Sequence, residues 1–222
     1  LSTLDYRQCI SWWDVERLAI AGSMACEHEV NAQAWQPEGR ILAVGTDRGV
    51  RLVDPAKGLA LQTLGLNTCW SKLHWMDEVQ LAMAGAGGSV RVYDVRKPTE
   101  PLLFVDFGLA EPLSLNLWHD GLLILDNDGE VFRIDLASGE DSIITDQLGA
   151  FSKDAEACFI PEVGSLAYPS NENIILCPVD SPPSLITIDS GGIILRKVLA
   201  LQHPRSLIAL DTIGQQVLYH YP

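Results

Sequence analysis

Residues 50–58 read VRLVDPAKG, and residues 90–98 read VRVYDVRKP. In both stretches apolar and polar residues alternate and run into an aspartate, Asp54 or Asp94, after which turn-forming residues follow. Alternation with a period of two is typical of a β-strand that buries one face. Because the two stretches begin 40 residues apart, we expect a repeat of about this length along the chain.

Two sets of markers support the repeat. Strand-closing aspartates stand 40, 41 and 45 residues apart at Asp54, Asp94, Asp135 and Asp180. Upstream of each, and once more after Asp180, lies a strand that ends in a large apolar residue before a polar or proline turn; this position is taken by Trp35, Trp75, Trp118, Ile160 and Leu201. Each repeat therefore predicts three strands joined by tight turns, followed by a looser fourth strand such as LALQTL (residues 59–64).

Four strands of this kind form a small antiparallel sheet that cannot bury both of its faces alone. Similar sheets must pack against one another, and radial packing gives a β-propeller. We therefore predict an all-β fold of about five and a half to seven four-stranded blades in a single domain over residues 1–222. The expected repeat units are 1–30, which is incomplete, and then 31–69, 70–111, 112–153, 154–196 and 197–222.

The repeat resembles the WD-repeat (WD40-like) β-propeller family over residues 31–222. The resemblance implies a divergent member, because the family's Gly-His dipeptide is missing and its Trp-Asp ending is replaced by Val-Asp, Tyr-Asp or Ile-Asp. The stretch CISWWDVERLAIAG (residues 9–22) reads as the opening of a unit, which places Trp13-Asp14 in the turn after a first strand. Trp13 precedes Trp35 by only 22 residues, so the first blade is expected to be incomplete.

Composition narrows the function. The formal net charge of -14 disfavours binding to nucleic acid and to anionic lipid, because both depend on basic residues that meet phosphate. No apolar window is long enough for a membrane span, and the first residues lack the layout of a signal peptide. Five scattered cysteines without a CxxC pair indicate reduced thiols and no metal site, so we expect an intracellular protein, cytoplasmic or nuclear.

Motifs that could bind ions or catalyse a reaction are better explained here as parts of turns and strands. Asp126 to Glu130 (DNDGE) lacks the ligand spacing of a calcium loop and is expected to form a hairpin turn. Gly85 to Gly88 is followed by no helix and is expected to be a turn, not a phosphate loop. The histidines share no catalytic or ligand spacing, so no catalytic residue, metal or cofactor is assigned: His28, His74, His119, His203 and His220. We therefore expect no enzyme.

The remaining candidate residues are structural or partner-binding. Trp35, Trp75 and Trp118 occupy one repeat position and are expected to wedge between blades. Trp12 and Trp70 are additional to the pattern, and each either packs in the core or binds a partner from a rim. Asp14 and Arg96 lie in expected loops and are candidates for partner binding.

The resemblance implies a non-catalytic platform for protein–protein interaction, a scaffold subunit of a larger hetero-oligomeric complex. The acidic composition favours protein partners with a basic surface. Two alternatives stay open. The first is an open propeller completed in trans by a partner subunit, as in coat and nuclear-pore scaffolds. The second is a phosphoinositide-binding propeller of autophagy or membrane trafficking, which the missing Phe-Arg-Arg-Gly signature disfavours.

Overall fold

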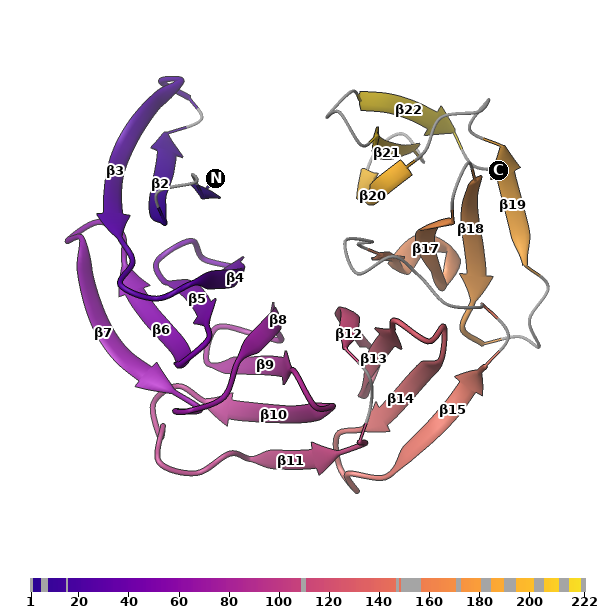
Figure 1. Ribbon diagram of the computed structural model, residues 1–222, viewed down its shortest axis with the longest axis horizontal. Helices are drawn as coiled ribbons and strands as arrows, with labels where there is room; N and C mark the ends of the chain where they lie inside the picture. Colours follow the sequence, from indigo (N-terminus) through magenta and orange to yellow (C-terminus); the bar gives the residue numbers. More distant parts are fainter. Residues whose placement is uncertain are drawn as a thin grey trace. The chain divides into compact units, whose positions relative to one another are not determined.

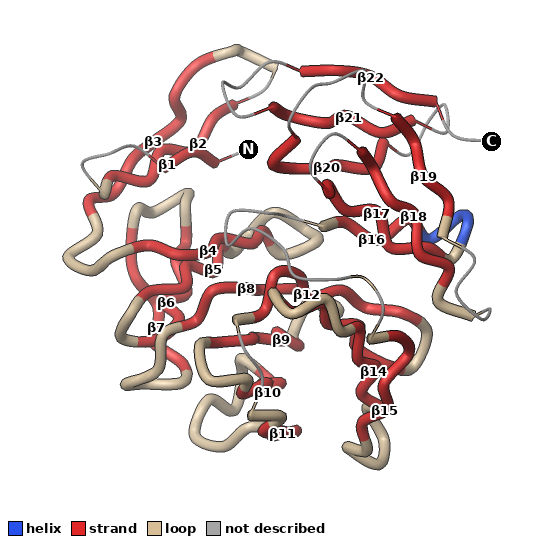
Figure 2. The backbone as a smooth tube through the Cα atoms, turned by 45° about the vertical axis from the view of Figure 1, so that its right-hand side comes forward, coloured by secondary structure: helices blue, strands red, loops and turns tan. Residues whose placement is uncertain are grey.

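In a computed structural model of the chain, strands make up most of the described residues, and the one helix described is a single 3-10 turn, η1 (Pro161–Val163) (Figure 2). The structure describes residues 2–4, 8–14, 16–108, 111–146, 148, 157–170, 173–180, 185–189, 195–201, 206–211 and 216–220. Within these ranges 22 strands form six antiparallel sheets, which confirms the predicted all-β fold of propeller blades. None of the helical structure in these ranges is long and apolar enough to cross a membrane.

The chain divides into two compact units, residues 1–115 and residues 116–222. Three sheets lie in the first unit, numbered here in chain order. Sheet 1 contains β1 (Ser2–Leu4), β2 (Cys9–Asp14) and β3 (Ala19–Ala25). Sheet 2 contains β4 (Val30–Trp35), β5 (Leu42–Thr46), β6 (Gly49–Asp54) and β7 (Leu59–Leu64). Sheet 3 contains β8 (Trp70–Trp75), β9 (Gln80–Gly85), β10 (Ser89–Asp94) and β11 (Leu103–Asp106).

Three further sheets follow, and the boundary between the units falls within the first strand of sheet 4. Sheet 4 contains β12 (Pro112–Trp118), β13 (Gly121–Asp126), β14 (Val131–Asp135) and β15 (Asp141–Thr145). Sheet 5 contains β16 (Cys158–Ile160), β17 (Ser165–Ser170), β18 (Asn173–Pro178) and β19 (Ile186–Asp189). Sheet 6 contains β20 (Leu195–Leu201), β21 (Ser206–Asp211) and β22 (Gln216–His220).

Each four-stranded sheet pairs its strands in chain order. In the first unit, the first strands of sheets 2 and 3, β4 and β8, lie at one edge of their sheets, and the fourth strands, β7 and β11, lie at the opposite edge (Figure 1). The second strands are mostly apolar and buried on both faces, as in LAVGT of β5 and GLLILD of β13. The fourth strands are the exposed edges, and Leu59 and Leu61 of β7 face solvent there.

Within each unit, hydrophobic cores lie between consecutive sheets. Ile10 of β2 packs with Val44 and Val53 of sheet 2. On the other face of sheet 2, Leu52 packs with Met83 of sheet 3. The second unit repeats this arrangement, with residues of sheets 5 and 6 in a common core. Neighbouring residues of β6 therefore serve two different cores, which is the mutual burial that the repeat requires.

The prediction for Trp13-Asp14 was wrong. These residues do not follow a first strand, because they end β2, which pairs with β1 on one side and β3 on the other. Asp14 Oδ1 accepts hydrogen bonds from the backbone N–H groups of Glu16 and Arg17, both at 3.0 Å. Asp54 caps the turn after β6 in the same way. β2 is therefore a third strand with a genuine Trp-Asp ending, and sheet 1 consists of a second, third and fourth strand within the described residues.

Candidate functional site

The connector between sheets 1 and 2, residues 26–29, crosses beside the tight hairpin that joins β5 to β6. Cys26 N–H donates to the carbonyl oxygen of Gln8 at 2.8 Å, and Asp47 N–H donates to the carbonyl oxygen of Glu29 at 3.3 Å. The Gln8 side chain accepts from Val30 N–H at 3.1 Å. Backbone hydrogen bonds thus tie the connector to both sheets, so its side chains project from a fixed frame.

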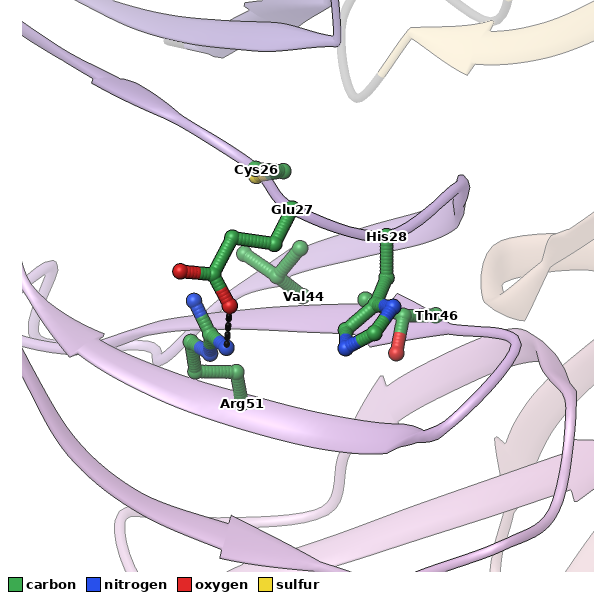
Figure 3. Close-up of a pocket in the computed structure, with 6 residues that line it drawn as sticks. All are labelled: Cys26, Glu27, His28, Val44, Thr46 and Arg51. Atoms are coloured by element: carbon green, nitrogen blue, oxygen red, sulfur yellow. Dashed lines mark ion pairs between the residues drawn. The ribbon is translucent and has the colours of Figure 1, made fainter.

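A small pocket opens beneath this connector (Figure 3). We call it the connector pocket, and it is lined by Cys26, Glu27, His28, Val44, Thr46 and Arg51. Its cavity volume is about 10 Å³, room for about one water molecule. Pockets for small molecules typically span roughly 300–1,000 Å³, so the connector pocket is too small to hold a cofactor.

Charged groups surround the connector pocket. Glu27 Oε2 and Arg51 Nη2 form an ion pair across it at 4.0 Å, drawn as the dashed line in Figure 3. The Glu27 side chain is 81% exposed, and His28 Nδ1 lies 3.7 Å from Asp47 Oδ1 at the rim. Exposed pairs of this kind contribute about 0–1 kcal/mol to stability, so these charges are available to a ligand at little cost to the fold.

The thiols near this site are protonated at neutral pH. Burial raises the pKa of Cys26, an effect that the charge of Arg51 partly offsets. Burial also raises the pKa of Cys69, and the carboxylates of Asp47, Glu111 and Glu29 raise it further. Cysteine nucleophiles require a lowered pKa, and these thiols show the opposite. Across the residues that the structure describes, no group of three or more His, Cys, Asp or Glu side chains is placed to hold a metal ion.

Comparisons with known proteins agree on the fold. The profile of the anaphase-promoting complex subunit 4 WD40 domain matches residues 10–78. A chain of a mitotic checkpoint complex crystal structure superposes with a TM-score of 0.79 at 18% identity, covering 97% of this chain and 68% of that one. The computationally designed Ika8 protein superposes with a TM-score of 0.74 at 14% identity, covering 99% and 67%. The chain has the fold of a β-propeller. No curated protein matches its sequence.

Three of the four marker aspartates of this propeller cap equivalent turns. Asp54, Asp94 and Asp135 each end a third strand and accept a hydrogen bond from the backbone N–H two residues later at 3.0 Å. Asp180 stands two residues beyond the end of β18 and accepts from Trp118 Nε1 at 3.3 Å. The backbone that would donate to it, residues 181–184, lies outside the described residues, so its role as a repeat marker stays a prediction.

The three repeat tryptophans all end first strands, but their contacts differ. Trp75 is buried, and its Nε1 donates to the carbonyl oxygen of Ala34 in the preceding sheet at 3.1 Å. Trp35 is partly buried and donates to Ser2 Oγ at 2.9 Å. Trp118, also partly buried, packs its ring 4.6 Å from that of Phe159 in sheet 5. Each of these side chains therefore contacts a neighbouring sheet.

The two additional tryptophans lie in the core, which is the first of the two alternatives that the sequence left open. Trp70 is 0% exposed, and its Nε1 donates to the carbonyl oxygen of Gly65 at 2.8 Å. Trp12 is 6% exposed and packs on Gly22, where a Cβ would come within 2.6 Å of its ring. The physical reason is space, because each glycine leaves room for an indole. Neither side chain is accessible to a partner.

Asp14 ends β2 and Arg96 lies in the turn after β10, and both side chains form ion pairs. Asp14 pairs with Arg17 at 3.5 Å. Arg96 binds both carboxylate oxygens of Asp94, at 2.9 and 2.7 Å. Each pair has one exposed partner, Arg17 or Arg96, as the Glu27–Arg51 pair does, so Asp14 and Arg96 stay candidates for partner binding.

Sequence reasoning missed the acidic residues around the connector pocket. Glu27 and Glu29 lie between a fourth and a first strand, and Asp47 lies in a two-residue hairpin. Their positions in the repeat could have identified them. The connector that enters a sheet and the hairpin between its second and third strands lie at the same end of that sheet. The expected turn at Gly85 to Gly88 is confirmed, since Gly88 N–H donates to the carbonyl oxygen of Gly85 at 3.2 Å. His203 lies outside the described residues.

Proposed function

We propose that this WD40-like propeller is a non-catalytic platform for protein–protein interaction that works as a subunit of a larger intracellular complex, cytoplasmic or nuclear. The observation that supports it best is the connector pocket, a shallow charged feature on connectors that two sheets hold in place. Rigid sheets with projecting loops suit recognition of a protein surface. The raised pKa of Cys26 and the small volume of the pocket fit this role better than covalent catalysis or cofactor binding.

We further propose that the partner presents a basic surface. Glu29, Asp47 and Glu111 all lie near enough to Cys69 to raise its pKa, so their carboxylates concentrate negative charge at one end of sheets 2 and 3. Arg48 pairs with Asp47 at 3.7 Å and offsets only part of this charge. Such a field steers an oppositely charged partner and speeds association more than it strengthens the final contact.

Affinity purification with mass spectrometry tests the platform. The test variant carries Glu27→Lys, Glu29→Lys and Asp47→Lys around the connector pocket. The matched control carries Glu140→Lys, Asp141→Lys and Asp146→Lys, which are exposed near β15 and change the charge equally. We expect a reproducible set of co-purifying proteins that the test variant loses and the control retains. An identical set with both variants, or no enriched protein with the unaltered chain, would overturn the proposal.

A further inference from the structure

The third strands of sheets 2 and 3 carry equivalent arginines. Arg51 and Arg91 stand 40 residues apart, at the same position in VRLVD and VRVYD. Cross-strand partners share one face of a sheet. Arg51 pairs with Val44, which belongs to the core with sheet 1, and Arg91 pairs with Met83, which belongs to the core with sheet 2. Each arginine therefore faces the preceding sheet, and their surroundings can be compared position by position.

The two arginines differ in their charge partner. Arg51 Nη2 pairs with Glu27 Oε2 at 4.0 Å across the connector pocket. Asn67 stands 40 residues after Glu27, so the connector between sheets 2 and 3 lacks that carboxylate. Within the part of the chain that the structure describes, Arg91 forms no ion pair, although most other basic side chains there do. Those that are paired are Arg17, Arg40, Arg48, Arg51, Lys57, Arg96 and Arg133.

Aromatic rings hold the Arg91 guanidinium instead. Its Cζ lies 5.3 Å from the centroid of the Trp70 ring and 5.1 Å from that of the Phe104 ring. The face of an aromatic ring attracts a cation, so these rings fix the position of the charge. Nε of Arg91 is buried and has no hydrogen-bond partner among the described residues. Buried donors are nearly always paired, so this guanidinium lacks an acceptor.

The terminal part of the Arg91 side chain is accessible to a partner. The residue is partly exposed, and Nε is the nitrogen of this side chain that is buried without a partner. Nη1 and Nη2 form no hydrogen bond within the described ranges, so both remain in contact with solvent. Phe104 is 54% exposed and Leu102 is 58% exposed, so an apolar surface adjoins the charge. The acid that ends β11, Asp106, accepts from Gly108 N–H at 3.0 Å and forms no ion pair with Arg91.

We propose that Arg91 receives the carboxylate of an aspartate or glutamate of the protein partner, while Phe104 and Leu102 pack against an apolar residue beside it. The two oxygens of a carboxylate can accept from Nη1 and Nη2 in a bidentate pair. This inference rests on the proposed platform function, and it adds one acidic residue to a partner surface that is basic elsewhere. We call Arg91, Phe104 and Leu102 the Arg91 receptor.

The test is a titration of the ¹⁵N-labelled full chain followed by NMR at low salt, which detects weak binding. The probe is the acetylated and amidated peptide Gly-Leu-Glu-Leu-Gly, and its control carries glutamine, which keeps the shape and removes the charge. The Nε–H signal of Arg91, identified by its absence from Arg91→Lys, should shift and saturate with the glutamate peptide. The glutamine peptide should bind roughly ten-fold more weakly, because its oxygen carries no charge.

Variants separate the receptor from the net charge. Arg91→Gln should lose roughly ten-fold in affinity for the glutamate peptide, as followed by the Trp70 indole N–H signal. Lys57→Gln removes the same charge at an exposed ion pair and should bind as the unaltered chain does. Phe104→Ala removes a ring that is half exposed, so the fold should persist while binding weakens.

Equal binding of the two peptides by the unaltered chain would overturn the receptor, as would equal binding by Arg91→Gln and Lys57→Gln. If Arg91→Gln does not fold, unchanged affinity of Phe104→Ala overturns it instead. The lysine variant at the connector pocket should still bind the glutamate peptide. Failure of the platform in the purification and failure of the receptor in the titration are therefore distinguishable.

Discussion

The indole Nε1 of Trp70 donates a hydrogen bond to the carbonyl oxygen of Gly65 at 2.8 Å, and the ring occupies the space that a side chain at position 65 would need. A Cβ there would lie 2.7 Å from Nε1 and 2.8 Å from the Met83 methyl group. The φ of 55° at Gly65 adds about 1–2 kcal/mol for any other residue. Gly65→Ala should therefore lower the free energy of unfolding, as measured by circular dichroism in urea.

Truncation of the same tryptophan tests the other half of the contact. Trp70→Ala removes a fully buried indole from the core between sheets 2 and 3, which should cost about 3–5 kcal/mol. Trp70→Phe keeps an aromatic ring but loses the hydrogen bond, so its cost should be smaller. Leu66→Ala, next to Gly65 and exposed, is the control and should change stability by less than about 0.5 kcal/mol. A Trp70→Ala chain as stable as this control would refute the wedge between the sheets.

The thermal stability of the chain at low pH should depend on the turn after β10. Two hydrogen bonds from Arg96 and one from its backbone lower the pKa of Asp94 from 3.8 to about 2. A carboxyl with a lowered pKa stabilises the fold above its unfolded value and loses that contribution as the pH falls. The difference in Tm between the chain and Asp94→Asn should therefore be constant above about pH 4.5 and shrink between about pH 4 and 2.

Asp141→Asn is the control for that experiment. Asp141 is exposed at the start of β15, and its substitution removes the same charge. Its Tm should follow that of the unaltered chain throughout the titration. A Tm difference for Asp94→Asn that persists undiminished at pH 2 would show that the ionised carboxylate is not what stabilises this turn.

The same turn shows where sequence reasoning succeeds and where it fails. Asp54, Asp94 and Asp135 could be predicted because strand ending and turn chemistry are both local properties. Trp13-Asp14 carries the same signature, yet Trp13 also fits the tryptophan position of a first strand. Only the pairing of β2 with β3 decides between them, and pairing depends on contacts that a single stretch of sequence does not contain.

Burial explains the remaining differences between the sequence-based predictions and the structure. Trp12 and Trp70 read alike as core or rim residues, and the glycines that make room for them, Gly22 and Gly65, become informative only once the sheets are assembled. The contact between the turns at residues 36–40 and 76–79 could not be predicted for a similar reason. Gln36 Nε2 reaches the carbonyl oxygen of Glu78 only once two repeats pack together.

His74 should make the fold sensitive to mild acid. It lies in β8, and burial lowers its pKa below 6.5, so the folded state disfavours the protonated ring. Stability is then complete above about pH 6.5 and falls as the unfolded state takes up the proton first. His74→Gln should flatten the decline of Tm between about pH 6.5 and 5. His119→Asn, in an exposed turn, should leave that decline unchanged, and a flat profile in the unaltered chain would contradict the prediction.

Thiol labelling should reveal the acidic field at the connector end of sheet 2. Burial and the carboxylates of Asp47, Glu111 and Glu29 raise the pKa of Cys69, so little thiolate is present at neutral pH. Removing two of these charges in Glu29→Gln/Asp47→Asn should lower that pKa and speed alkylation by iodoacetamide at pH 7.5, as followed by peptide mass spectrometry.

Burial, the larger cause, persists in that variant, so Cys69 should still react more slowly than it does in the urea-unfolded chain. Cys177 is an internal standard, because burial alone raises its pKa and its rate should not change. Glu100→Gln/Asp141→Asn, at two exposed positions, removes the same two charges elsewhere and controls for net charge. A rate for Cys69 that rises equally in this control would trace the effect to the overall charge of the chain, and the carboxylates proposed to attract a basic partner would then exert no local field at this thiol.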